Sequence, residues 1–172
     1  MPDQVWNVRV ETPADIPAIR SLLVQAFPAE PHLGDVLDGL RADPDTWLPE
    51  LSVVAEEATT RAIIGHALIT RCRIDEAPAL ALGPCGVVPD WQNQGVGSAV
   101  IRAALAAARA QPENLVVVLG HPTYYPRFGF APASRLGLRA TFEAGDAMMA
   151  QVFDDSRPHP TGTIYYAKAW DQ

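Results

Sequence analysis

Residues 87–98 are Val87-Val88-Pro89-Asp90-Trp91-Gln92-Asn93-Gln94-Gly95-Val96-Gly97-Ser98. An apolar run ends here in a polar turn, and an amphipathic helix is predicted from Gly97 to just before Pro112. The first amides of a helix have no intrahelical acceptor and lie at the positive end of the helix dipole. The junction therefore predicts an anion site, with Gly95 and Gly97 allowing close approach to the backbone.

Two nucleotide-binding motifs do not fit this loop. A Walker A loop requires Gly-Lys-Ser/Thr, and residues 87–98 contain no Lys. The dinucleotide fingerprint requires a third glycine where Val100 stands, and an acidic residue about 20 positions further on. The chain has Val116-Val117-Val118-Leu119-Gly120 there.

Strands are predicted on both sides of the loop and helix. Leu80–Val88 precedes them, and Gly83-Pro84-Cys85-Gly86 within it predicts a bulge. Leu115–Leu119 is wholly apolar, which is typical of a strand buried on both faces. Residues 80–119 therefore form a predicted parallel βαβ unit.

The remaining elements follow from hydrophobic periodicity and turn residues. Helices are predicted from Thr12-Pro13 to Pro28, with Thr12 as N-cap, and near Leu33–Leu40. Further strands are predicted at Val5–Val10, Leu51–Glu56, Ala62–Ile74, Ala147–Phe153 and Thr163–Ala169.

A hairpin turn centred on residues 76 and 77 places Cys72 opposite Ala81 and Cys85 opposite Leu68. The two cysteines are then not cross-strand neighbours, so no disulfide is predicted. Their number and spacing predict no metal site either.

Composition limits the classes of protein. The 172 residues, 48% of them hydrophobic and 19% charged, predict a single globular domain spanning 1–172. The net charge of −7, with no cluster of Lys or Arg, disfavours nucleic acid. The sequence shows neither a signal peptide nor a membrane segment, so we expect a cytoplasmic protein that does not bind membranes.

Two motifs resemble one family. Gln92-Asn93-Gln94-Gly95-Val96-Gly97 is similar to the Gln/Arg-x-x-Gly-x-Gly/Ala pyrophosphate loop of the GNAT superfamily of N-acetyltransferases. Gly120-His121-Pro122-Thr123-Tyr124-Tyr125-Pro126-Arg127-Phe128-Gly129-Phe130 resembles the second coenzyme A segment of a YhbS-like subset, Tyr-Tyr-x-Arg-Phe-Gly-Phe after a Gly-x-Pro turn. The tail Gly162-Thr163-Ile164-Tyr165-Tyr166-Ala167 resembles that subset's last strand, so the resemblance spans nearly the whole chain.

The resemblance implies an α+β GNAT fold, with a mixed, mostly antiparallel sheet whose central parallel strand pair is splayed and flanked by helices. It implies acetyl-CoA as co-substrate and no metal. The Val87 amide would stabilise the oxyanion, and Tyr125 would be the general acid for the departing thiolate. The cofactor-binding residues implied are Val87, Val88, Gln92, Asn93, Gln94, Gly95, Val96, Gly97 and Ser98.

The expected reaction is direct attack on the thioester by a primary amine. The amine belongs to a small molecule or a peptide. The alternative is a non-catalytic acyl-CoA binding or sensing module. An acetyl-cysteine route through Cys85 is disfavoured, because no His or cation close in sequence would lower the pKa of its thiol.

Several points stay open in the sequence. The strand before the loop lacks the acidic residue that serves many relatives as general base, so His121, His66, His32 and Glu30 are the candidates, with His121 named first. The acceptor amine, the acyl-chain preference and the oligomeric state, a homodimer included, are not determined.

Overall fold

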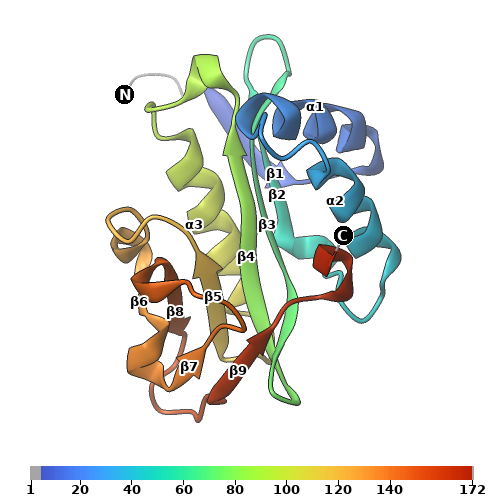
Figure 1. Ribbon diagram of the computed structural model, residues 1–172. Helices are drawn as coiled ribbons and strands as arrows, with labels where there is room; N and C mark the ends of the chain where they lie inside the picture. The colour runs from blue at the N-terminus through green and yellow to red at the C-terminus, as the bar shows by residue number, and fades with distance from the viewer. Residues whose placement is uncertain (1–4, 172) are drawn as a thin grey trace.

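The computed structural model describes residues 5–171; residues 1–4, part of the stretch inspected for a signal, and residue 172 lie outside the described residues. Within 5–171 one sheet has nine strands in the order β1-β2-β3-β4-β5-β8-β6, with β9 beside β3 and β7 beside β9 (Figure 1). The strands are β1 (Trp6–Val10), β2 (Ser52–Glu57), β3 (Ile63–Ile74), β4 (Ala77–Val87), β5 (Leu115–Leu119), β6 (Ala131–Pro132), β7 (Leu138–Arg139), β8 (Met148–Val152) and β9 (Gly162–Tyr165). The helices are α1 (Ile16–Ala26), α2 (Leu33–Ala42) and α3 (Val96–Ala108).

The sheet is mixed and mostly antiparallel, as the sequence predicts. Among the strands of residues 5–171, only β4 with β5, and the short β7 with β9, pair in parallel. The connection from β4 to β5 runs through α3, which confirms the predicted βαβ unit. No helix within residues 5–171 combines the length and the apolar character that spanning a membrane requires.

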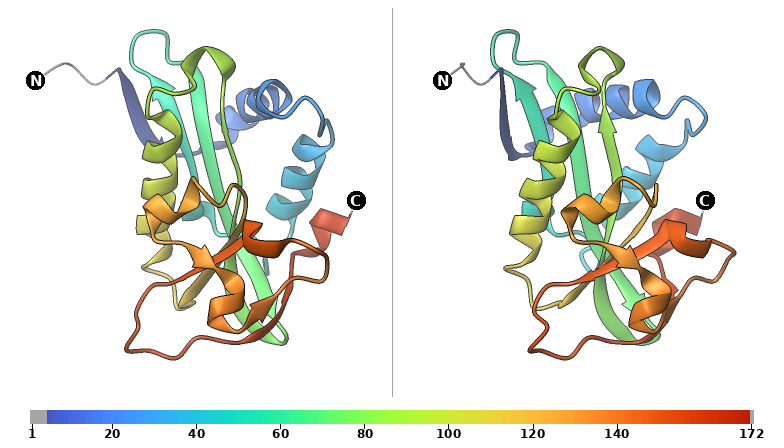
Figure 2. Two further views of the ribbon diagram at one scale, coloured as in Figure 1. Left: turned by 60° about the vertical axis from the view of Figure 1, so that its left-hand side comes forward. Right: turned by 90° about the vertical axis from the view of Figure 1, so that its left-hand side faces the viewer.

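Helices cover both faces of the sheet (Figure 2). The predicted stripe of α3 is buried against strand residues such as Ile69 and Leu80. On the other face, α1 and α2 pack over Val54 and Leu68. Burial of each large apolar side chain contributes about 1.5–3 kcal/mol, so these two layers hold the sheet between them.

The start of the first helical segment follows from its capping residues. Thr12 is the N-cap of this segment, and its amide N–H donates to Oδ2 of Asp15 at 2.7 Å, which is the reciprocal bond of a capping box. A 3-10 turn, Pro13–Asp15, then leads into α1. Arg9 pairs with Asp15 at 2.7 Å and, with the Thr12 hydrogen bonds, lowers the pKa of that carboxyl to about 2.

The central parallel pair is short, and the two strands then diverge. β4 and β5 pair only over Leu80–Leu82 with Val116–Val118. Beyond this point Ile69 lies opposite Leu82 but Ala67 lies opposite Cys85, so two residues of β4 face the single residue Leu68. This irregularity is the predicted bulge. Its Gly83 has φ +141°, a conformation that other residues rarely adopt.

The predicted register of the β3–β4 hairpin is wrong by two residues. Ile74 pairs with Ala77, so the turn consists of Asp75 and Glu76, and Asp75 adopts φ +47°. Cys72 therefore faces Ala79, and after the bulge Cys85 faces Ala67. Both cysteines are free, as predicted.

The last strand ends earlier than the sequence predicts. β9 stops at Tyr165, which pairs with Arg73, and Lys168–Asp171 forms a 3-10 turn close to α2. The reason lies on β3, where the amide of Arg71 donates to the Thr46 carbonyl at 3.0 Å. That edge of β3 is already occupied, so β9 cannot extend along it.

A buried polar cluster joins β1, β2, β3 and α2. Arg41 donates twice to the Glu11 carboxylate, at 3.0 and 3.1 Å, and Ser52 donates its hydroxyl to the same carboxylate. Nε2 of His66, which is fully buried, lies 3.0 Å from the Ser52 hydroxyl. Burial and the nearby Arg41 charge lower the pKa of His66 from 6.5 to about 3, so the folded protein holds a neutral imidazole.

We expect His66 to make the protein sensitive to acid. Between pH 6.5 and about 3 the unfolded chain binds a proton at this residue that the folded chain does not. The stability contributed by neutral His66 is therefore present above pH 6.5 and is lost as the pH falls toward 3. Melting temperatures measured from neutral to acidic pH should fall less steeply for His66→Gln than for the wild type. His32→Gln, on an exposed loop, should keep the wild-type slope, and equal slopes for all three proteins would contradict the assignment.

Candidate active site

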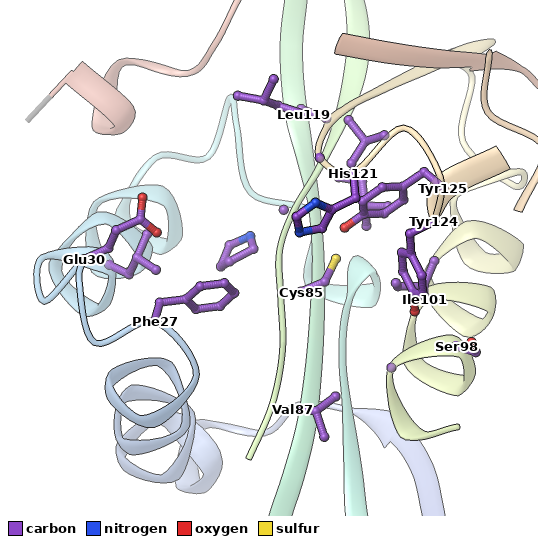
Figure 3. A pocket seen from close by; sticks show the side chains of 18 of the residues that line it. Phe27, Glu30, Cys85, Val87, Ser98, Ile101, Leu119, His121, Tyr124 and Tyr125 are labelled. Carbon is purple, nitrogen blue, oxygen red and sulfur yellow. The ribbon is translucent and has the colours of Figure 1, made fainter. Parts of the chain in front are cut away.

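A cleft of about 1140 Å³ lies where β4 and β5 part. Figure 3 shows Cys85 and Val87 of β4 along its middle, with Phe27 and Glu30 on the α1–α2 side. Ser98 and Ile101 of α3 lie on the opposite side. The volume suits a large ligand together with a smaller one.

The first turn of α3 opens on this cleft with its amides uncapped by a side chain. The N-cap is Gly95, in a left-handed conformation with φ +93°, and it has no side chain to accept from the helix amides. The first amides are those of Val96, Gly97 and Ser98, and Gly97 and Ser98 line the cleft. The predicted anion site is thus an exposed helix N-terminus that faces a cavity.

The polar side chains of the loop bind the protein's own backbone. Gln92 donates through Nε2 to the Val87 carbonyl at 3.0 Å, and Gln94 donates to the Asp90 carbonyl at 3.1 Å. Asn93 takes φ +64°, which asparagine tolerates better than most residues. The side chains of Gln92 and Gln94 therefore hold the shape of the loop.

Val87, the last residue of β4, and Val88, which follows it, differ in what their amides can do. The Val88 amide donates to the Ile64 carbonyl at 3.0 Å, so it is already used by β3. Because backbone groups alternate in direction along a strand, the Val87 amide points away from β3, toward the edge where β5 has diverged. Of the two residues, only Val87 can offer its N–H to a ligand.

The structure brings most of the predicted site residues to one cavity. Val96 is buried, with its side chain against Gly65, so only its backbone can serve a ligand. Val88 and Gln94 belong to the same loop but do not line the cleft. The predicted residues that line it are Val87, Gln92, Asn93, Gly95, Gly97, Ser98 and Tyr125.

Tyr125 and Cys85 meet at the centre of the cleft. The Tyr125 hydroxyl lies beside the Cys85 sulfur (Figure 3), and burial, followed by the neighbouring thiol, raises the pKa of Tyr125 above its ordinary value. The phenol therefore stays protonated and can donate a proton. Burial raises the pKa of the Cys85 thiol to about 12, against the opposing effect of the Tyr125 hydrogen bond, so Cys85 is a poor nucleophile.

Two residues of the second motif were missed as site candidates. The Tyr124 hydroxyl would lie 3.4 Å from a Cβ placed on Gly97, so it faces the start of α3. Arg127 donates to the Tyr124 carbonyl at 2.8 Å and lies 4.3 Å from the centre of its ring. Arg127 thus brings a cation to the cleft. The sequence could have indicated Arg127 as a site residue, because it is part of the Tyr-Tyr-x-Arg-Phe-Gly-Phe motif.

The candidates for general base separate in space. Glu30, His32 and His121 line the cleft. His66 belongs to the buried cluster with Ser52 and is not among the lining residues.

The arginines on α3 and just after it do not line the cleft. Arg102 and Arg109 lie over the rings of Phe128 and Phe153. Within residues 5–171 no three His, Cys, Asp or Glu side chains are grouped as metal ligands.

Comparison with known proteins decides the family. Residues 49–132 match the family model described as "Acetyltransferase (GNAT) domain". The chain is 34% identical over 133 residues to the uncharacterized N-acetyltransferase YjhQ of Escherichia coli K12, covering 75% of this chain and 71% of YjhQ. The chain belongs to the GNAT family. A second GNAT relative, the uncharacterized N-acetyltransferase YhbS of E. coli, is 26% identical over 163 residues, covering 92% and 95% of the two chains.

Solved GNAT structures share the fold. E. coli YhbS in complex with CoA superposes with a TM-score of 0.89, at 23% identity, and covers all of this chain and 95% of YhbS. A GNAT acetyltransferase from Brucella melitensis in complex with acetyl-CoA gives a TM-score of 0.78 at 30% identity, covering 96% and 98% of the two chains. The expected GNAT fold and the resemblance to YhbS are therefore confirmed.

We expect Cys85 to react slowly with thiol reagents in spite of its place in a cleft. With its pKa raised to about 12, its thiolate fraction near neutral pH is far below that of an ordinary thiol. Alkylation by iodoacetamide at pH 8, followed by mass spectrometry, should be about a hundredfold slower than for free cysteine. A Cys72→Ala variant removes the other thiol from the assay. Labelling of Cys85 at the rate of free cysteine would contradict the assigned environment.

Proposed function

We propose that the chain, acting as one domain over residues 1–172, binds acetyl-CoA and transfers its acetyl group to a primary amine. One observation carries the proposal: the uncapped N-terminus of α3 faces the gap between β4 and β5. Membership of the GNAT family and the CoA-bound and acetyl-CoA-bound relatives support it.

The start of α3 suits a pyrophosphate. The Gly95 N-cap leaves the first amides free of a side-chain acceptor, and the helix dipole favours negative charge there. The backbone of residues 92–98 would provide the contacts, because Gln92 and Gln94 are engaged with Val87 and Asp90. Arg127 would add a positive charge near the same end of the cleft.

The free edge of β4 suits the reacting end of the co-substrate. An amine attacking the thioester carbonyl displaces CoA and places negative charge on the carbonyl oxygen. The Val87 N–H, fixed by the strand and directed at the open edge, would stabilise that charge without reorganisation. Gln92 holds the same residue at the same open edge, by donating to the Val87 carbonyl.

Tyr125 would protonate the leaving thiolate. Burial keeps its hydroxyl protonated, and the hydroxyl points at the Cys85 sulfur in the middle of the cleft. The same environment keeps Cys85 a thiol, which supports direct transfer over an acetyl-cysteine route.

The alternative is a binding or sensing module that holds acetyl-CoA without turnover. Its phosphate-binding residues would be the same, so only a reaction distinguishes it. Release of free thiol in the presence of a panel of amines supports the enzyme, whereas tight binding without release supports the module.

Replacement of Gly97 by Val should weaken binding of acetyl-CoA. A Cβ at this position meets Tyr124 and Val87 at ordinary contact distances of 3.4 and 3.5 Å, so the fold should survive. The two methyl groups would occupy the approach to the α3 amides. We expect a loss of roughly tenfold in affinity, or about 1.4 kcal/mol, by calorimetry. Ala106→Val, on the exposed side of the same helix, is the control, and unchanged affinity in Gly97→Val would remove the phosphate-site assignment.

Tyr125→Phe should bind acetyl-CoA normally and turn over slowly, because it loses one hydroxyl and keeps the packed ring. General acid catalysis typically contributes about 10²- to 10⁴-fold, and we expect the lower end because a thiolate is a tolerable leaving group. The measurement is kcat from steady-state thiol release.

Tyr124→Phe is the matched control for Tyr125→Phe. Its hydroxyl faces Gly97 and not Cys85, so its loss should act on cofactor affinity more than on kcat. A slow Tyr124→Phe enzyme beside a normal Tyr125→Phe enzyme would reverse the assignment.

A further inference from the structure

The cleft has a second end, across from α3, whose residues have no assigned role in the proposed acetyl transfer. Phe27 and Glu30 come from the connection between α1 and α2 and lie across the cleft from α3 (Figure 3). Tyr166 and Trp170 come from the segment after β9, which lies beside α2 (Figure 1). Segments far apart in the sequence therefore enclose one space next to Cys85 and Tyr125.

This end has a largely aromatic and apolar lining. Phe27 and Trp170 are partly buried and pack against the core under α1 and α2, so their remaining surface faces the cleft. Leu119 and Phe142 also line the cleft and remain 48% and 46% exposed. Exposed large apolar side chains around a cavity favour a ligand with an apolar body.

The charges of the lining are separated between its two ends. Glu30 and Arg127 are the formally charged lining residues, beside the titratable His32 and His121. Arg127 is held against Tyr124, near the start of α3. Within residues 5–171 the Glu30 carboxylate has no cation within ion-pairing distance. The second end thus offers an unpaired carboxylate and no Lys or Arg.

We propose that the acceptor is a primary amine attached to an aromatic or similarly bulky apolar group and carrying no acidic group. Glu30 attracts its ammonium group, and Phe27 and Trp170 hold its apolar body. The inference rests on the proposed acetyl transfer. An acceptor with a carboxylate or phosphate would meet Glu30 without a compensating cation, and a polyamine would leave the aromatic surface uncovered.

The reaction balances with this acceptor. The ammonium group releases one proton to solvent, and the neutral nitrogen forms the C–N bond to the acetyl carbon. The C–S bond breaks and Tyr125 delivers its proton to sulfur. The second proton lost from nitrogen passes through solvent to the Tyr125 phenolate and restores the phenol. The products are an N-acetylated arylalkylamine and CoA.

An amine panel tests the proposal by its ranking. 2-Phenylethylamine is compared with phenylalanine, which adds a carboxylate to the same body, and with spermidine, which lacks an apolar body. We expect kcat/KM from thiol release to be at least about tenfold higher for 2-phenylethylamine than for either competitor. A preference for phenylalanine or spermidine, or equal values for all three, would overturn it.

Two variants link the preference to the residues. Glu30→Gln should raise KM for 2-phenylethylamine about threefold or more and weaken the dependence of KM on salt. Glu143→Gln makes the same change on an exposed side chain outside the lining and should behave as the wild type. Trp170→Ala should raise KM for 2-phenylethylamine more than KM for ethylamine. Parallel changes for both amines, or a normal Glu30→Gln enzyme, would contradict the assigned subsite.

Calorimetry with acetyl-CoA alone distinguishes a failure of the proposed acetyl transfer from a failure of the proposed acceptor class. Both variants should bind it as the wild type does, because neither residue belongs to the phosphate end. If the wild type does not bind acetyl-CoA, or acetylates no amine, the proposed function fails and this inference fails with it. If it acetylates hydrophilic or acidic amines best, the transfer stands and only the acceptor class is wrong.

Discussion

The structure depends on one interruption in hydrogen bonding, the point where β4 leaves β5 after Leu82. Upstream, the two strands pair in parallel at the centre of the sheet and α3 covers them. Downstream, β4 continues to Val87 with one edge open, and backbone groups at such an edge need partners. A continuous sheet would fill this space with its own hydrogen bonds, so the site exists because the sheet is incomplete.

The residues around the gap prevent the chain from closing it. The bulge at Gly83 and Pro84 shifts the register of β4 on β3. Gln92 satisfies the Val87 carbonyl from the side, which stabilises the strand end without covering its amide. Glycine at the N-cap of α3 leaves the first turn without a side-chain acceptor. The bulge and the glycine N-cap each lack a local hydrogen bond, Gln92 supplies one, and all three features line the same cleft.

The environment at the centre of the cleft also favours one chemistry. Burial raises the pKa of both Tyr125 and Cys85, so both are protonated at neutral pH. A protonated phenol suits donation to a leaving group, whereas a protonated thiol is a weak nucleophile. Cys85 therefore packs in the cleft as a thiol, and the proposed general-acid role of Tyr125 rests on the position of its hydroxyl beside Cys85.

The sequence by itself determined what short stretches of chain encode. The α3 stripe, the buried β5 and the glycine loop between β4 and α3 depend on residues close to one another, as does the bulge at Gly83. The tertiary structure decided the hairpin register, because the turn at Asp75 and Glu76 is held by β9: the Asp75 amide donates to the Thr163 carbonyl at 2.8 Å, and the Asp75 carboxylate accepts from the Thr163 amide at 3.1 Å. It also decided the end of β9, because the distant Thr46 carbonyl occupies the β3 edge. The tertiary structure also decided the second end of the cleft: Glu30 and Trp170 are far apart in sequence, and packing of Lys168–Asp171 beside α2 brings both residues to one cavity.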